Sequence, residues 1–212
     1  MKNMLILVIL VIGQSMPVHA KTLTIGLDLS GSNPLVESTD YAGVVARSVR
    51  EKINAMALGD RVVLRTFGQR GLNNLKTIKV QINRRDRPEK IGRALSRIIH
   101  AIPEKQLNIQ ENTNIVAFLE FTDFGCGQGG EVFLVTDGIE SSSYVAGPAF
   151  LRGKASLPQP DEDVLKGCAV TMFGIGKNVN GPWPPQQVKN IRKQWTSWME
   201  KAGAEFNPVI DP

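Results

Sequence analysis

The stretch TLTIGLDLSGS (residues 22–32) begins like a buried strand and ends in polar side chains. Apolar and polar residues alternate through TLTI, which is typical of a β-strand with one face in the core. Asp28, Ser30 and Ser32 then occupy every second position, so one carboxylate and two hydroxyls can face the same side of the chain. We therefore predict a strand over 22–29 whose carboxyl end carries a cluster of oxygen donors.

The first twenty residues have the pattern of a secretory signal peptide. Lys2 supplies the positive start, MLILVILVIG is a short apolar core, and VHA ending at Ala20 offers small residues for cleavage. A membrane anchor, the competing interpretation, is disfavoured because this apolar run is half as long as the roughly 20 residues that a spanning helix needs. We expect a single domain over 21–212 that is periplasmic or secreted, and the short lysine-bearing leader suggests a bacterial periplasm.

The charge balance is too mild to indicate a nucleic-acid-binding protein. Removing Lys2 from the 25 lysines and arginines leaves 24 against 20 acidic residues, a net charge of +4. Export argues further against nucleic acid as the partner. Part of the excess lies in NRRDRPEK (83–90), which is typical of a solvated turn. No stretch after Ala20 is long and apolar enough to span a bilayer, so we expect no transmembrane segment in the mature chain.

Strand-like and helix-like segments alternate along the chain, which indicates an α/β fold with a mostly parallel sheet. Besides 22–29, the pattern predicts strands over 61–68, 76–83, 131–138 and 168–176, and helices over 40–57, from Pro88 onward, over 114–124 and over 184–203. The connection between the second and third strands is too short for a crossover helix, so these two should be antiparallel. The segment 139–167 is expected to be a long loop that borders the functional face and could gate access to it.

Three separate segments carry hard oxygen donors. They are the D-x-S-x-S of Asp28, Ser30 and Ser32, Thr113 in ENTNI at a helix start, and Asp137 in FLVTDGIE at a strand end. Ligands of open α/β sheets bind at the carboxyl ends of strands where the strand order reverses, and the strands that hold Asp28 and Asp137 would flank that point. Each residue alone has an ordinary alternative, because Ser and Asp form turns and Thr113 can simply cap a helix.

This donor set favours a hard cation. Hydroxyls and carboxylates without cysteine or clustered histidine select Mg²⁺, and Mn²⁺ is also acceptable. Past Ala20 the chain has one histidine, His100, in the helical stretch LSRIIHAI. A zinc site is therefore disfavoured, and so is a Ser-His-Asp hydrolase, because no G-x-S-x-G elbow accompanies Ser30 or Ser32.

Two cysteines, Cys126 and Cys168, lie at or just before the starts of the predicted strands 131–138 and 168–176. If those strands are parallel neighbours, their starting ends lie side by side and a disulfide is geometrically reasonable. Export to an oxidising compartment favours the bridge. Two buried free thiols are the alternative, since burial is common for cysteine.

These residues match a known pattern: the mature chain resembles a von Willebrand factor type A (vWA) domain. The metal-ion-dependent adhesion site of that family combines D-x-S-x-S, a threonine in a middle loop and an aspartate after the fourth strand. DLSGS, Thr113 of NTNI and Asp137 of VTDG match it, and WMEKAGAEF (198–206) is similar to the last helix and its exit. The resemblance implies a six-stranded sheet of order 3-2-1-4-5-6, with strand three antiparallel and helices on both faces.

The resemblance also implies a role for each donor. Ser30 and Ser32 would bind Mg²⁺ directly, Thr113 would bind it when ligand is present, and Asp28 and Asp137 would act mainly through bridging waters. Neutral hydroxyls leave the charge of the cation poorly compensated, so a Glu or Asp of a protein partner would complete the octahedron. The function implied is that of an exported, non-enzymatic adhesion or assembly domain.

Two other functions and one departure from the family pattern stay open at this point. A metal-assisted phosphotransfer enzyme is one alternative, although Ser30 occupies the place where such enzymes usually have a second acid. A structural domain that binds no metal is the other. The family loop before the threonine is commonly rich in glycine, whereas here it is NIQENTN, and Glu111 could either fill the open metal position or face solvent.

Overall fold

The computed structural model describes residues 20–68, 76–105 and 110–210. The predicted signal peptide lies outside these ranges except for Ala20, so it stays a prediction. In the described part of the chain, no helix combines the length and the apolar character that crossing a membrane requires.

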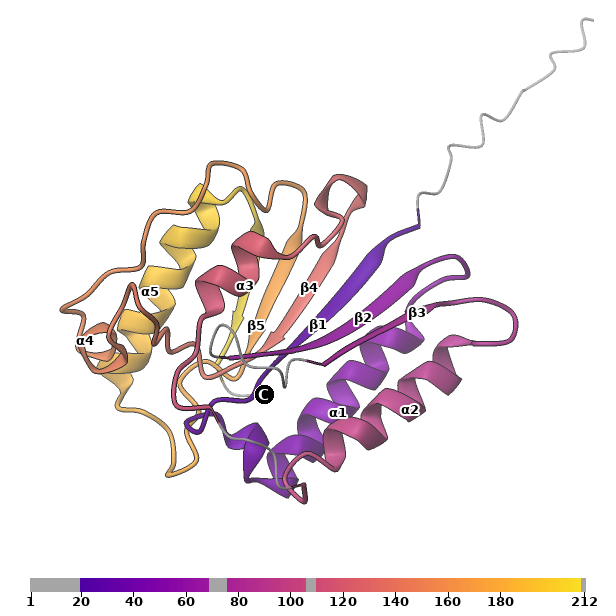
Figure 1. Ribbon diagram of the computed structural model, residues 1–212, viewed down its shortest axis with the longest axis horizontal. Coiled ribbons are helices and arrows are strands. Elements are labelled where there is room, and N and C mark those ends of the chain that lie inside the picture. The colour runs from indigo at the N-terminus through magenta and orange to yellow at the C-terminus, as the bar shows by residue number, and fades with distance from the viewer. Residues whose placement is uncertain (1–19, 69–75, 106–109, 211–212) are drawn as a thin grey trace, which may run out of the picture.

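A six-stranded sheet of order β3-β2-β1-β4-β5-β6 forms the centre of the protein (Figure 1). The strands are β1 (Thr22–Asp28), β2 (Arg61–Phe67), β3 (Thr77–Gln81), β4 (Glu131–Val135), β5 (Ala169–Phe173) and β6 (Glu205–Val209). Only the β2–β3 pair is antiparallel. The predicted fold class, strand order and antiparallel third strand are therefore confirmed.

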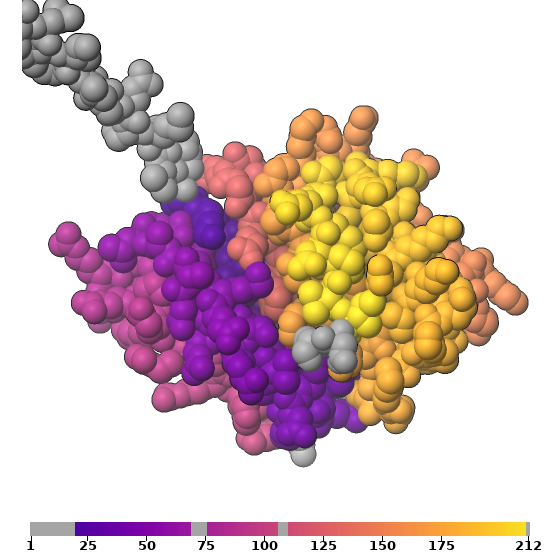
Figure 2. Space-filling model, turned by 180° about the vertical axis from the view of Figure 1, so that it is seen from behind, coloured from indigo at the N-terminus to yellow at the C-terminus, as the bar shows by residue number. Residues whose placement is uncertain are grey.

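Helices cover both faces of this sheet (Figure 1). On one face lie α1 (Thr39–Asn54) and α2 (Pro88–His100), and on the other lie α3 (Ile115–Phe121), α4 (Gly147–Leu151) and α5 (Pro185–Lys201). Two short 3-10 helices, Pro34–Val36 and Cys126–Gln128, complete the elements. Seen from behind, the N-terminal half of the chain (indigo to magenta) lies beside the C-terminal half (orange to yellow) in Figure 2.

Two apolar cores follow from this layering, one on each face of the sheet. Leu23, Ile25 and Leu27 of β1 belong to the core under α1 and α2. Gly26 lies on the opposite face, where an added Cβ would come within 3.0 Å of the Phe118 ring of α3. Glycine at this position therefore lets α3 pack directly on the central strand.

The strand β1 sits at the middle of the sheet, and its register decides which residues meet at one end. It pairs with β2 from Thr22↔Arg61 to Asp28↔Phe67, and with β4 from Leu23↔Glu131 to Leu27↔Val135. Because both pairings are parallel, the loops that follow β1 and β4 leave the same edge of the sheet.

Several element ends differ from the sequence prediction. The predicted strands to 138 and 176 stop at Val135 and Phe173, and the helix predicted over 114–124 spans only Ile115–Phe121. Residues 136–138 and 174–176, which were predicted to belong to these two strands, instead form turns at the edge of the sheet. Asp123 shortens the helix, since its carboxylate accepts a hydrogen bond from Gly125 N at 2.9 Å and starts a turn.

The segment 139–167 was predicted as a long loop, and outside 147–151 it has no regular secondary structure, whereas its gating of the functional face stays a prediction. It contains α4, and its Val145, Phe150 and Leu165 are buried in the core with α5. Gln194 of α5 accepts from Leu157 N at 3.1 Å and donates to Ala155 O at 3.2 Å. Much of the segment thus packs along α5, and its Ser- and Pro-rich sequence does not predict this packing.

Cys126 and Cys168 form a disulfide, which confirms the predicted pairing. Their Cα atoms are 4.5 Å apart, and the register Glu131↔Ala169 shows why: the two residues precede neighbouring parallel strands. The bridge closes a loop with a sequence separation of 42 residues.

Replacing both cysteines, as in Cys126→Ala with Cys168→Ala, should lower the free energy of unfolding by about 4 kcal/mol. The chain-entropy cost that the loop imposes on the unfolded state gives this size. Guanidinium unfolding measures it. A reductant should destabilise the wild type and leave the double variant unchanged. Equal unfolding midpoints for the double variant and the wild type without reductant would contradict a structural bridge.

Candidate metal centre

Asp28 closes β1 with a carboxylate that is completely buried. Its Oδ1 accepts a hydrogen bond from Ser30 N at 2.8 Å, and its Oδ2 accepts one from the Thr136 hydroxyl at 2.8 Å. The Asn33 amide donates to the carbonyls of Asp28 and Val135 at 3.0 and 3.2 Å. These bonds clamp the end of β1 to the end of β4 and fix the position of the carboxylate.

The two serines follow on the same turn. Their hydroxyl oxygens lie 3.4 Å apart, and Ser30 is almost fully buried. Gln110, on the segment before Thr113, holds this turn with two backbone hydrogen bonds, accepting from Gly31 N at 3.0 Å and donating to Leu29 O at 3.2 Å. The alternation seen in the sequence thus produces a hydroxyl pair beside the Asp28 carboxylate.

Thr113 comes from a different part of the chain and is tied to the loop after β4. Its N–H and carbonyl both bond to Ser141, each at 2.9 Å, as an isolated antiparallel bridge. The next residue, Asn114, caps α3 by accepting from Ala117 N at 2.8 Å. The N-cap of α3 is therefore Asn114, and the alternative in which Thr113 caps this helix is wrong. The side chain of Thr113 is buried at this edge of the sheet.

Asp137 is the second fully buried carboxylate of the edge. Its Oδ1 accepts from Ile139 N at 2.9 Å, while its Oδ2 has no hydrogen-bond partner among the described residues. The loop around it is fixed by α5, since the Trp195 indole donates to Gly138 O at 2.7 Å. Gly138 has φ +80°, a conformation in which glycine is favoured.

Burial makes both carboxylates hard to ionise. It raises the pKa of Asp28 to about 6 and that of Asp137 to about 7, and the negative charge of Asp28 contributes to the second shift. The same two acids affect Tyr41 on α1: burial raises the pKa of its phenol, and the negative charges of Asp137 and Asp28 raise it further. A divalent cation between these acids would remove the penalty by favouring their ionised forms.

The residues present fit Mg²⁺ or Mn²⁺. Ser30, Ser32, Thr113, Asp28 and Asp137 offer only hard oxygens, and the unpartnered Asp137 Oδ2 is an acceptor that lacks a donor or a cation. No three His, Cys, Asp or Glu side chains of the described residues gather as a metal-binding group. Any cation at this edge would therefore depend on the hydroxyls as well as on the two acids.

Glu140 is the functional candidate that sequence reasoning missed. It is fully buried, and its Oε2 accepts from Ile115 N at 2.8 Å and Val116 N at 3.1 Å, at the start of α3. Burial raises the pKa of this carboxyl as well. Together with the Thr113–Ser141 bridge, it fastens the threonine loop to the loop after Asp137. A second acid three residues after Asp137 was the one signal in the sequence.

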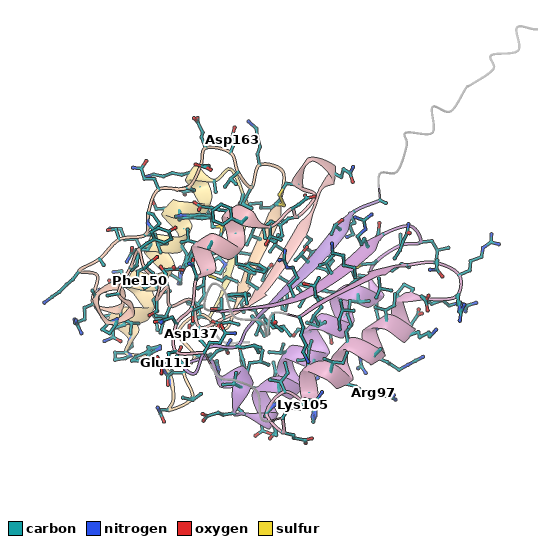
Figure 3. The ribbon with its side chains drawn as sticks, viewed as in Figure 1. Arg97, Lys105, Glu111, Asp137, Phe150 and Asp163 are labelled. Carbon is teal, nitrogen blue, oxygen red and sulfur yellow. A yellow bond between two sulfur atoms is a disulfide. The ribbon has the colours of Figure 1, made fainter. Side chains whose placement is uncertain are left out.

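Glu111 is exposed, as its solvent-facing position requires, and its other predicted position, at the open metal site, stays a prediction. Figure 3 labels Glu111 and Asp137 at the end of the sheet where β1 and β4 finish. Of the segment 139–167, which was expected to border this face, residues 139–141 do so, through Ile139, Glu140 and Ser141. The five predicted donors thus lie at the end of β1 and on loops that are bonded to one another at this edge.

No protein-family profile matches the chain, and no curated protein matches it in sequence. Solved structures do match. The open conformation of the pilus adhesin SpaC from Lactobacillus rhamnosus GG has a TM-score of 0.50 and 14% identity, over 92% of this chain but only 28% of the adhesin. An aerotolerance-related membrane protein from Bacteroides fragilis NCTC 9343 has a TM-score of 0.49 and 14% identity, over 91% of this chain and 92% of that one.

The protein BatB from Bacteroides thetaiotaomicron matches to a similar degree, with a TM-score of 0.48 and 16% identity over 91% of this chain and 92% of its own. The strand order, the antiparallel β3 and the helices on both faces are those that the sequence resemblance implies. The fold is vWA-like. At such low identities the likeness concerns the fold alone.

Without metal, the vWA-like domain should become less stable as the pH rises from about 4 to about 7. The folded pKa values of Asp28 and Asp137 lie above the unfolded value of 3.8, so the folded state retains protons that the unfolded state has released. The expected loss is on the order of a few kcal/mol, and it ends above pH 7.

Urea unfolding in the presence of a chelator, across this pH range, measures the effect. Asp137→Asn removes one titrating group and should flatten the profile, and Mg²⁺ should stabilise the wild type more at pH 8 than at pH 5. A profile that rises with pH would contradict the assignment of two buried, unpaired acids.

Glu140→Ala should weaken both the fold and metal binding. The change leaves the N–H groups of Ile115 and Val116 buried without an acceptor, at about 1–3 kcal/mol for each group. Glu140→Gln keeps a carbonyl acceptor and is the matched control. Thermal unfolding with and without Mg²⁺ measures both effects, and a metal-dependent shift in Glu140→Ala as large as in the wild type would show that Glu140 does not support the Thr113 loop.

Proposed function

We propose that this protein is a non-enzymatic protein-binding domain, for adhesion or assembly, that recognises a partner through a bound metal ion. Mg²⁺, or Mn²⁺ in its place, would be held by five side chains: Asp28, Ser30, Ser32, Thr113 and Asp137. The ion would supply a positive centre at the surface of an otherwise closed sheet edge. A Glu or Asp of the partner would bind at that centre.

The unpartnered Oδ2 of Asp137 carries the proposal. A buried carboxylate oxygen without a donor is costly, and a second buried carboxylate, Asp28, lies close enough to raise its pKa further. Natural folds rarely keep such a pair without a compensating group. The hydroxyls of Ser30 and Ser32 beside it add the neutral oxygens that a hard cation needs.

An acidic partner follows from the charge and number of these ligands. Three of the five donors are neutral hydroxyls, and Mg²⁺ requires near-octahedral coordination by oxygen. A carboxylate from outside would supply both the missing oxygen and negative charge.

Four observations support an exported protein that is not an enzyme. The disulfide suits an oxidising compartment, and the leader has the pattern of a secretory signal. One of the similar folds belongs to a pilus adhesin, although this chain spans only 28% of that protein. The one histidine past Ala20, His100, ends α2 and makes no described hydrogen bond to a serine or an acid, so it offers no general base to Ser30 or Ser32.

Calorimetric titration of the mature protein with Mg²⁺ or Mn²⁺ tests the metal site. Binding heats should be seen for the wild type and should vanish in Asp28→Ala with Ser30→Ala. The double change Ser156→Ala with Asp161→Ala, at two exposed residues that are not among the five donors, is the control and should bind as the wild type does. Equal heats from the wild type and the Asp28 variant would overturn the proposal. Metal-dependent turnover of a phosphate ester, lost in Asp28→Asn, would favour phosphotransfer instead.

The acidic partner is tested separately, by measuring how many water molecules remain coordinated to protein-bound Mn²⁺. Mn²⁺ bound to the protein should speed proton relaxation of the solvent, and a short peptide with one Glu should reduce this effect by displacing water. The same peptide with Gln is the matched control. If Mn²⁺ binds and the Glu and Gln peptides behave alike, the metal site stands and the acidic partner is rejected.

A further inference from the structure

A large groove lies along α5, and it adjoins the donor edge, because Gly176 in its lining donates to Asp137 O at 2.9 Å. It has a volume of about 1230 Å³, and its lining combines apolar residues such as Ile175, Trp183 and Val188 with the basic side chains of α5. Sites for small molecules are typically about 300–1,000 Å³ and enclose most of the ligand. The size of this groove therefore suits an extended ligand better than a compact one. The C-terminal segments that include α5 are orange to yellow in Figure 2.

Three cations line one stretch of the groove. Lys189, Arg192 and Lys193 are spaced i, i+3, i+4 on α5, which makes them neighbours on one face of the helix. All three are exposed, and none of them forms a hydrogen bond or an ion pair with another described residue. Lys166, in contrast, pairs with Asp163 at 2.6 Å. The groove thus presents a concentrated positive charge that the described part of the chain leaves uncompensated.

The apolar wall is fixed by the backbone and does not depend on a ligand for its shape. Trp183 N donates to Gly176 O at 2.9 Å, which ties the backbone before α5 to the turn after β5. Gly176 has φ +82°, and an added Cβ would lie 2.6 Å from Val188 Cγ2, so the absent side chain lets Val188 pack closely. A preformed wall lowers the entropic cost of binding.

We propose that this groove binds an acidic, apolar-bearing peptide segment of a partner protein. Acidic side chains of the segment would lie over Lys189, Arg192 and Lys193, and its apolar side chains would pack on Trp183 and Val188. The site is distinct from the metal centre, because none of the five donors lines it. It does not require a bound metal.

The same features disfavour other anionic ligands. Nucleic-acid interfaces are more polar and much more positively charged than this one, whose lining is largely apolar. A membrane surface is bound by a convex or flat apolar face with basic flanks, and here the apolar residues lie inside a concavity. Peptide recognition in a groove, in which charges select the ligand and apolar contacts hold it, fits both properties.

Glu200 gives the groove a direction. It lines the end that is nearer to the C-terminus of α5, roughly two turns beyond Lys193. Its negative charge would repel an acidic residue there, so the acids of the segment should bind at the Lys189 end. Electrostatic mismatch of this kind is a common source of specificity.

Fluorescence anisotropy with a labelled peptide of alternating Glu and Leu tests the proposal, and the same peptide with Lys for Glu is the control. The Glu peptide should bind the mature wild-type protein in the presence of chelator, and the Lys peptide should not. Lys189→Glu with Arg192→Glu should weaken binding by tenfold or more. Lys79→Glu with Arg84→Glu, which makes the same charge change on β3 and the following turn, should leave binding within twofold of the wild type.

A variant that is expected to bind more tightly distinguishes a direct effect on the groove from misfolding. Glu200→Lys removes the repulsion and should tighten binding of the Glu peptide by severalfold, which an unfolded variant would not do. The proposal is overturned if the Glu peptide does not bind, if both double variants lose affinity equally, or if anionic vesicles or RNA bind more tightly than the peptide. Because chelator is present throughout, loss of the metal centre would not mimic any of these outcomes.

Discussion

The parallel pairing of β1 with β4 brings two carboxylates into one buried place, and much of the sheet edge is arranged around that constraint. The register Leu27↔Val135 sets Asp28 and Asp137 at the ends of adjacent strands. Each acid is completely buried, and each has a pKa far above its ordinary value. Burial disfavours the ionised form of both acids, and a divalent cation would favour it.

The loops that surround this pair are joined by backbone bonds and so behave as one unit. Gln110 joins the serine turn to the threonine segment, and Ser141 joins that segment to the loop after β4. Trp195 then connects the same loop to α5. The groove on α5 lies at the end of this chain of contacts.

The sequence predicted the fold well where local pattern and burial agree. The alternation before Asp28, the spacing of apolar residues from Pro88 onward and the short link between β2 and β3 each specify an element without tertiary help. The strand β6 is different: EFNPV contains Pro208 and lacks a strand pattern, so only the resemblance implied it. Pro208 is tolerated because β6 is the edge strand of the sheet.

The candidate site was predictable in part, for a related reason. The five donors follow strand ends or precede a helix, so their chemistry shows in the sequence. Glu140 does not, since its role depends on the N–H groups of Ile115 and Val116, which lie more than twenty residues earlier. The packing of 139–167 along α5 was missed because its buried Val145, Phe150 and Leu165 are spaced without a regular period.

The most direct test of the central claim is a crystal structure of the mature protein soaked with Mn²⁺, with the metal located by its anomalous scattering. We predict one strong peak at the carboxyl edge of the sheet, bonded to the hydroxyls of Ser30 and Ser32 and within reach of Asp28 and Asp137 directly or through one water. An empty edge at saturating Mn²⁺, or a metal bound elsewhere while Asp28 and Asp137 stay unligated, would contradict the account.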